Sequence, residues 1–175
     1  MPKIKQISKA LSGAMLYFAL GTLCVPVAQA RSPKFLLKTQ CVDTGVGNWS
    51  RTEDDVSIDK AVYTSLFYMG PGDGSASLTC KINPDNNYYY QRLNLGFGMR
   101  DNDRRSPPVD VNIYANGKRI DSRTISAGEK ASVSLDVTNV RNVSLETVCS
   151  DRTRYCERVY FFKATLEPIP PPPAR

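Results

Sequence analysis

The sequence contains no histidine. Imidazole is the usual general base of serine and cysteine hydrolases and the commonest metal ligand, so its absence excludes Ser-His-Asp and Cys-His catalysis and histidine metal sites. The 175 residues also lack a convincing amphipathic helical segment and an internal repeat. Apolar and polar residues instead alternate over short stretches bounded by turn residues, which is typical of an all-β protein.

The first thirty residues predict a secretory signal peptide. They combine a basic start with three lysines, a mostly apolar stretch from Leu11 to Val27, and small residues at Ala28 and Ala30, so we expect cleavage after Ala30. A lipid anchor at Cys24 is the alternative, although the leucine before it is bulkier than such a site requires. We therefore expect the protein in the periplasm, at the cell surface or outside the cell, without a transmembrane segment in the mature chain.

Residues 31–175 are long enough for one domain with a sizeable core. Without the three lysines of the leader, the chain keeps 20 basic residues against 17 acidic ones, so its net charge falls from +6 to about +3. The basic groups Arg104-Arg105, Lys118-Arg119, and Arg152 with Arg154 are dispersed in predicted loops. A nucleic-acid surface needs a concentrated basic stripe, so we predict no nucleic-acid partner.

Four cysteines follow the leader, at Cys41, Cys80, Cys149 and Cys156. An even count in an exported chain predicts two disulfides, with three connectivities open. Cys149 ends one predicted strand and Cys156 begins the next, so their pairing would close the loop 150–155 and leave Cys41 for Cys80. Loop-closure entropy would then contribute about 2.5 and about 4 kcal/mol. A four-cysteine zinc site is the alternative, but neither pair has the two-residue spacing of a zinc knuckle.

Residues 109–166 predict an antiparallel β-module. Apolar positions from Val109 to Ala115 alternate with polar ones, and Asn116-Gly117 suits a two-residue type I′ turn that would set Ile113 opposite Ile120. The alternation returns at 133–137 and 143–145. Together these patterns favour a β-sandwich.

Three further patterns describe other strands. We predict strands at 61–69 and 75–82, separated by the glycine-rich turn 70–74. Gly96 and Gly98 lie on the outer face of a strand at 93–99, which predicts that another segment crosses close to it. The run 160–162 is aromatic throughout, so either both faces of the last strand are buried or a bulge interrupts it. Pro168 to Pro173 should leave the ladder as a polyproline II tail.

Clusters of oxygen-bearing side chains offer two further sites. The segments 85–87 (Asp-Asn-Asn) and 101–103 (Asp-Asn-Asp) could hold a structural calcium ion, although Asx turns explain both. Glu53, Asp54, Asp55 and Asp59 could supply the paired carboxylates of a glycosidase, but a solvated loop explains them better. We predict no catalytic residue and no cofactor other than such a calcium ion.

Loop aromatics are the remaining functional signal. Their flat rings can stack on sugar rings while their polar edges stay hydrated. The candidate ligand-binding residues are Trp49, Tyr88, Tyr90 and Tyr155, together with Arg100 as a donor to hydroxyl groups.

The stretch from Leu93 to Leu166 resembles the later part of the NPCBM family of carbohydrate-binding modules. The matching pieces are the strand 95–101 (LGFGMRD), the hairpin 111–118 (VNIYANGK), the segments 133–137 (VSLDV) and 140–146 (VRNVSLE), and the closing strand 159–166 (VYFFKATL). The family usually has a His and a Trp before its last strand, whereas the segment 150–158 has neither. The resemblance implies a galactose-binding-like jelly roll. From the leader and the proline run we expect this single domain to occupy 31–167, followed by a proline-rich tail at 168–175.

Two functions follow from these observations. The first is a secreted, non-catalytic protein that binds a glycan through its loops. The second is an extracellular or envelope scaffold that contacts a protein partner through the proline-rich tail.

Overall fold

The computed structural model describes residues 32–84 and 89–170. The signal peptide, Cys24, the 85–87 segment, Tyr88 and the tail beyond 170 therefore lie outside the described residues. In chain order the elements are β1 (Lys34–Phe35), the 3-10 turn η1 (Leu36–Lys38), β2 (Gln40–Asp43), β3 (Asn48–Ser50), β4 (Asp55–Ile58), β5 (Ala61–Thr64), β6 (Phe67–Gly70), β7 (Ser75–Lys81), β8 (Tyr90–Gly98), β9 (Val109–Ala115), β10 (Lys118–Ile125), β11 (Lys130–Asp136), β12 (Asn142–Cys149) and β13 (Val159–Pro168).

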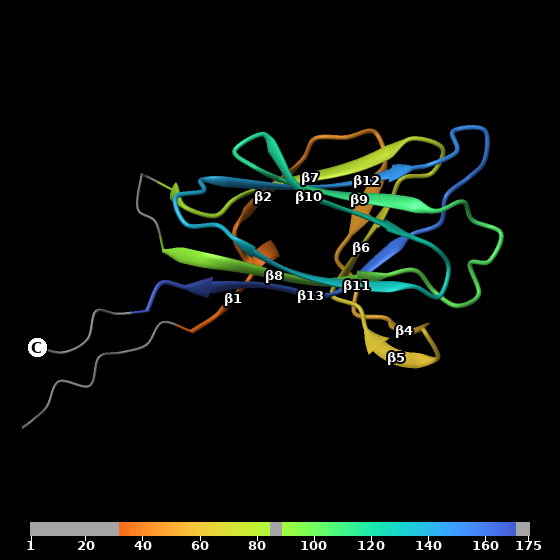
Figure 1. The fold of residues 1–175 in the computed structure, drawn as a ribbon, viewed down its shortest axis with the longest axis horizontal. Coiled ribbons are helices and arrows are strands. Elements are labelled where there is room, and N and C mark those ends of the chain that lie inside the picture. The colour runs from red at the N-terminus through yellow and green to blue at the C-terminus, as the bar shows by residue number, and fades with distance from the viewer. Residues whose placement is uncertain (1–31, 85–88, 171–175) are drawn as a thin grey trace, which may run out of the picture.

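Two antiparallel sheets pack face to face (Figure 1). One has the order β10-β9-β12-β7-β2, and the other has the order β11-β8-β13-β6-β3 with β1 beside β13. The strands alternate as the sequence predicts, with Val143, Leu145 and Cys149 of β12 buried and the residues between them mostly half-exposed. The predicted antiparallel β-sandwich is confirmed.

The main core lies between the sheets. Phe67, Phe97 and Phe161 are fully buried there, and the rings of Phe67 and Phe161 stack with their centroids 4.4 Å apart. Burial of large apolar side chains from both sheets is the principal force that holds the layers together.

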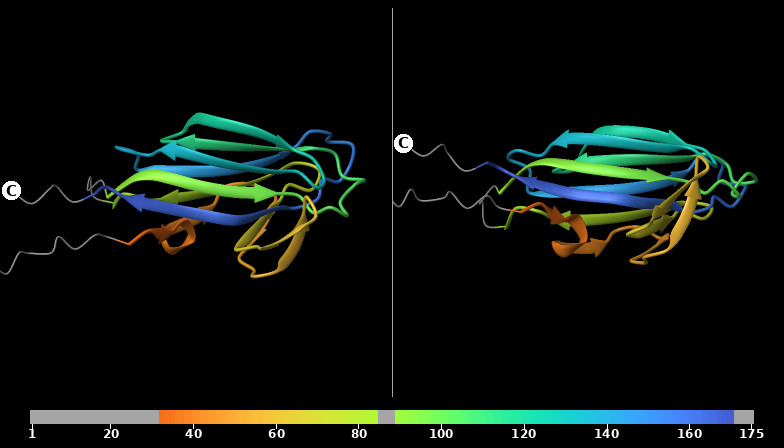
Figure 2. Two further views of the ribbon diagram at one scale, coloured as in Figure 1. Left: turned by 60° about the horizontal axis from the view of Figure 1, so that its bottom comes forward. Right: turned by 90° about the horizontal axis from the view of Figure 1, so that it is seen from below.

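A two-stranded ribbon, β4–β5, stands out from the six-stranded sheet (Figure 2). Val56 and Ile58 of the ribbon pack with Tyr160 in a second, smaller apolar cluster. The glycines of β8 make this approach possible, because a Cβ on Gly98 would lie 3.0 Å from Cγ2 of Ile58 and 2.5 Å from the Glu129 carbonyl oxygen. A Cβ on Gly96 would lie 2.5 Å from the ring of Phe162. The predicted crossing is confirmed at Gly98, whereas the close neighbour of Gly96 is Phe162 of the paired strand β13.

The last strand combines both predicted features. Tyr160 and Phe161 point to opposite faces and are both buried, because the ribbon covers the outer face. The register with β8 then shifts between Phe161 and Lys163, which marks a bulge.

Three details of the predicted strands are wrong. Ile113 pairs with Asp121, since a register shift between Arg119 and Asp121 expels Ile120 from the ladder and leaves it 39% exposed. The single strand predicted at 61–69 is two strands in different sheets. The chain turns at Ser65, whose backbone N–H donates to the Asp54 carbonyl.

The third detail concerns Pro168, which pairs with Tyr90 at the end of β13. Proline lacks only the N–H donor, so the ladder can continue on the N–H of Ile169, which donates to the Tyr89 carbonyl at 2.9 Å.

Both predicted disulfides are present, Cys41–Cys80 and Cys149–Cys156. The first joins directly paired positions of β2 and β7. The second closes the loop between β12 and β13, as the spacing predicts. Within the described residues, no helix is long and apolar enough to span a membrane.

Candidate functional site

The sequence-predicted ligand residues that the structure describes do not all come together. Tyr90 begins β8 at the end of the sandwich that also holds β1, where it lines a groove of about 500 Å³. Trp49 lies on β3 and packs half-buried against the main core, with its indole Nε1 lacking a hydrogen-bond partner among the described residues. Arg100 and Tyr155 lie at the opposite end of the molecule, in the loops that follow β8 and β12 (Figure 1).

A polar cleft of about 650 Å³ opens beside the ribbon at this second end. One wall comes from β4 and the residues before it, the other from the loop after β8, and the floor from the start of β13. The lining residues are Asp54, Asp55, Val56, Ser57, Arg100, Asp101, Asn102, Arg158 and Tyr160. Carboxylates, guanidinium groups and a carboxamide thus face one volume, which is large enough for a small ligand.

Arg100 is fixed in the cleft by the buried Asp103. Its Nε and Nη2 donate to the two carboxylate oxygens at 3.3 and 3.0 Å, and its guanidinium carbon lies 5.3 Å from the centre of the Tyr160 ring. Burial lowers the pKa of Arg100, but the hydrogen bond and charge attraction to Asp103 outweigh it, so the pKa is raised above its ordinary value. The guanidinium is therefore a positioned, permanently charged donor.

A second arginine borders the same aromatic pair. The guanidinium carbon of Arg158 lies 4.1 Å from the centre of the Tyr68 ring, and the Tyr68 and Tyr160 rings are 6.1 Å apart. Burial raises the pKa of the Tyr160 hydroxyl, which the two neighbouring arginines only partly offset. The phenol is therefore a neutral group at physiological pH. Stacking on an aromatic face restrains each arginine while leaving the edge of its guanidinium available for hydrogen bonds.

Asp101 ties the ribbon to the sandwich. Its carboxylate accepts hydrogen bonds from the Ser57 hydroxyl at 2.6 Å and from the backbone N–H groups of Asp59 and Lys60 at 2.8 and 3.1 Å. The Ser57 hydrogen bond, followed by those to the two amides, lowers the pKa of Asp101 below its ordinary value. Asp101 therefore stabilises the wall of the cleft.

The same contacts bear on the predicted calcium site. Asp101 already accepts three hydrogen bonds and Asp103 accepts from Arg100. In the part of the chain that the structure describes, no three acidic, cysteine or histidine side chains gather as a metal site. A calcium ion at 101–103 stays a prediction that these contacts do not favour.

The predicted acidic cluster is divided. Asp54 and Asp55 line the cleft, where they accept hydrogen bonds from Thr52 and Thr64. Asp59 instead lies at the ribbon turn and pairs with Lys130 at 2.6 Å. Two of the four acidic residues are thus placed to accept hydrogen bonds from a ligand.

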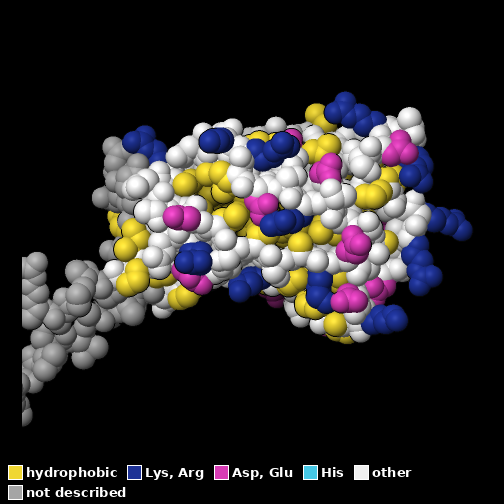
Figure 3. Space-filling view, in the orientation of Figure 1, with side chains coloured by type: hydrophobic (Ala, Val, Ile, Leu, Met, Phe, Trp, Pro, Cys, Tyr) yellow, Lys and Arg dark blue, Asp and Glu magenta, His cyan; other side chains and the backbone are white. Residues whose placement is uncertain are grey.

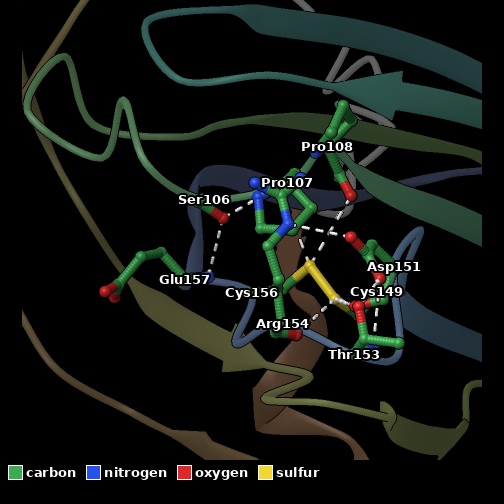
Figure 4. Close-up of a disulfide and its surroundings, with 9 residues drawn as sticks. All are labelled: Ser106, Pro107, Pro108, Cys149, Asp151, Thr153, Arg154, Cys156 and Glu157. Carbon is green, nitrogen blue, oxygen red and sulfur yellow. Dashed lines mark hydrogen bonds and ion pairs between the residues drawn. A yellow bond between two sulfur atoms is a disulfide. The ribbon is translucent and has the colours of Figure 1, made fainter.

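The disulfide loop contacts the segment 106–108, which follows the cleft residues 100–102 in the chain (Figure 4). The Ser150 N–H donates to the Pro108 carbonyl at 3.1 Å, and the Glu157 N–H donates to the Ser106 hydroxyl at 2.9 Å. The loop residue Tyr155 is 62% exposed and lies against the Gly72 turn, where a Cβ would be 3.7 Å from its ring. Its ring is open to solvent but does not line the cleft.

Sequence reasoning missed Arg158 and Tyr160 as site residues and considered Asn102 only as part of a calcium site. The unbroken aromatic run at 160–162 contained a signal, because a buried outer face requires a covering segment. That the covering segment is the ribbon, and that a cleft forms at its edge, depends on contacts between residues about 100 positions apart.

No family model and no curated protein matches the sequence. Solved structures do match. One contains the CBM51-2 module, in complex with GlcNAc, and INT domains of ZmpB from Clostridium perfringens, with a TM-score of 0.63 and 13% identity over 79% of this chain and 32% of that one. Another is a CBM51 from Clostridium perfringens GH95 in complex with methyl-galactose, with a TM-score of 0.59 and 8% identity over 77% of this chain and 99% of that one.

A third match is the tandem CBM51 modules of Sp3GH98 from Streptococcus pneumoniae, with a TM-score of 0.60 and 12% identity over 77% of this chain and 47% of that one. The chain spans about a third of the length of the first of these structures. These likenesses show the fold, which is that of galactose-binding-like carbohydrate-binding modules. The matches support the module fold implied by the resemblance, without singling out the NPCBM family.

Proposed function

We propose that the protein is a non-catalytic glycan-binding module that acts outside the cytoplasm, and that sugar binds in the polar cleft between the ribbon and the loop after β8. The observation that carries this proposal is the meeting of Arg100, Arg158, Asn102 and Asp54 around one 650 Å³ volume. Sugars present hydroxyl groups that both donate and accept, and these side chains supply both partners.

Contacts within the protein hold the side chains of the cleft in place, and their chemistry indicates what each would do with a sugar. Arg100 and Arg158 are held on the tyrosine rings and donate to hydroxyl oxygens. The Asp54 and Asp55 carboxylates accept from hydroxyl groups, and Asn102 can do either. Such positioned groups lose little conformational entropy when a ligand binds. Tyr155 is an additional stacking surface at the same end, whereas this site does not use Trp49 or Tyr90.

Two further observations support the proposal. The matched solved structures include modules in complex with GlcNAc and with methyl-galactose, and this chain has the same fold. Its two disulfides suit an oxidising compartment, in agreement with the predicted leader. The scaffold alternative depends on the proline-rich tail 168–175, most of which lies outside the described residues.

Glycan-array binding of the wild type and of Arg158→Ala tests the cleft. We expect the variant to lose at least about tenfold in affinity, because it removes a restrained charged donor from the site. The matched control is Arg51→Ala, since Arg51 also stacks on a ring, that of Phe35, but lies outside the cleft. Equal binding by wild type and Arg158→Ala at similar melting temperatures would contradict the proposed site, and no binding to any glycan would contradict the function.

A further inference from the structure

Two turns at the cleft end present arginines that are not paired with any of the described residues. The first turn, Asp103 to Ser106, is closed by the Ser106 N–H, which donates to the Asp103 carbonyl at 2.8 Å. Arg104 and Arg105 occupy its two central positions, and both are exposed. Neither side chain makes an ion pair or hydrogen bond with the chain over 32–84 and 89–170.

The second turn repeats this arrangement in the disulfide loop. The Arg154 N–H donates to the Asp151 carbonyl at 3.1 Å, and exposed Arg152 lies at a central position. In each turn the leading aspartate is neutralised by an arginine of its own: Asp103 by Arg100 and Asp151 by Arg154. The central arginines of the two turns therefore keep their full charge for an outside partner.

The two turns form one surface. The disulfide loop is bonded to the 106–108 segment through the Ser150 amide and through the Glu157 amide, the latter drawn in Figure 4. The two loops therefore hold each other in place. Lys and Arg side chains project from this end of the molecule in Figure 3. Glu157 is the other acidic group of the segments 103–106 and 150–157, and its charge interacts with that of Arg100. The three exposed central arginines therefore outnumber it.

A second hollow lies directly beside the polar cleft. It has a volume of about 480 Å³ and is lined by Asn102, Asp103, Arg104, Arg105, Ser106 and Glu157. Asn102 borders both hollows, and Glu157 adjoins the Arg158 of the cleft. Two adjacent hollows of similar size suit successive units of one polymer, and the second presents unpaired guanidinium groups.

We propose that this end of the domain binds an acidic polysaccharide, with the carboxylate or sulfate of one sugar unit at Arg104 and Arg105 while the neighbouring unit occupies the polar cleft. This inference rests on the proposed function and names its ligand class. Guanidinium groups bind carboxylate and sulfate oxygens through paired N–H donors, which gives preference over a neutral sugar at the same position. Because the arginines are exposed, salt weakens this preference.

The test compares ligands that differ only in charge. Polygalacturonate is paired with its fully methyl-esterified form, and dextran sulfate with dextran, in titrations at about 50 and 500 mM NaCl. We expect at least one charged polymer to bind about tenfold more tightly than its neutral counterpart at low salt. Arg104→Gln with Arg105→Gln should remove that difference while preserving the melting temperature.

The matched control is Lys118→Gln with Arg119→Gln. It removes the same charge from the exposed β9–β10 turn at the far end of the sandwich. Equal loss in both double variants, equal binding of charged and neutral polymers, or equally tight binding of duplex DNA would overturn the inference. Neutral-glycan binding that depends on Arg158 but shows no charge preference would overturn the inference alone and leave the proposed function standing.

Discussion

Two segments at the cleft end of the sandwich are held in opposite ways. The β4–β5 ribbon is attached by non-covalent contacts, namely the Asp101 hydrogen bonds, the Lys130–Asp59 ion pair and a small apolar cluster. The 150–155 loop is closed by the Cys149–Cys156 disulfide and by Asp151, which accepts from Thr153 and Arg154. The disulfide holds the arginines of the loop in place, whereas the position of the ribbon depends on the protonation state of Asp101 and on apolar packing.

The largest expected effect comes from opening the covalent segment. Cys149→Ser with Cys156→Ser should lower the free energy of unfolding by about 2.5 kcal/mol, because the unfolded chain regains the entropy of the closed loop. The Cys41–Cys80 bond and the main core should keep the sandwich folded. Denaturant unfolding measures the change. An unfolded double variant would show that the disulfide stabilises the sandwich by more than the entropy of the closed loop.

A smaller effect is expected from adding a side chain to β8 where the ribbon packs against it. Gly98→Ala places a Cβ 2.5 Å from the Glu129 carbonyl and 3.0 Å from Ile58, so backbone must shift and the free energy of unfolding should fall by about 2 kcal/mol. Gly74→Ala is the control, because its nearest neighbours would be 3.9 Å away. Equal stability of the two variants would mean that both the Glu129 backbone and Ile58 of the ribbon move aside at little cost.

The smallest effect concerns protonation. Asp101 has a lowered pKa in the folded protein, so its stabilising contribution is fully present above the ordinary aspartate pKa near 3.8 and is lost as the pH falls through the folded value. We expect the Asp59 and Lys60 amides to lose their hydrogen bonds to Asp101 in that acidic range. The 150–155 loop should stay closed even where Asp151, whose pKa is about 2, becomes protonated, because the disulfide still holds its ends.

An NMR titration of the amide resonances measures this difference. Asp101→Asn should remove most of the pH response of the Asp59 and Lys60 amides. Asp136→Asn is the matched control, since Asp136 also accepts from a backbone amide, that of Thr138, but lies away from the ribbon. Ribbon amides that titrate unchanged in Asp101→Asn would show that another group controls them.

The sequence by itself determined the local features of this protein. Alternation defined β9 and β12, and Asn116-Gly117 defined a hairpin turn with positive φ at both residues. The spacing of Cys149 and Cys156 favoured their bond among the three possible connectivities. These features were predictable because each depends on residues that are near one another in the chain and on backbone preferences that hold in any fold.

Only the tertiary structure decided the cleft. Asp54, Arg100 and Arg158 meet because β4, β8 and β13 come together, and strand pairing over such separations follows from the packing of the whole core. The same reason explains the error at Ser65, where a change of sheet overrides local alternation. The error at Ile120 comes from a bulge inside the β9–β10 hairpin. The arginines of the two loops are dispersed in the sequence, but the pairing of β9 with β12 brings both loops to one end of the sandwich. Sequence reasoning could not see this because the two strands are far apart in the chain.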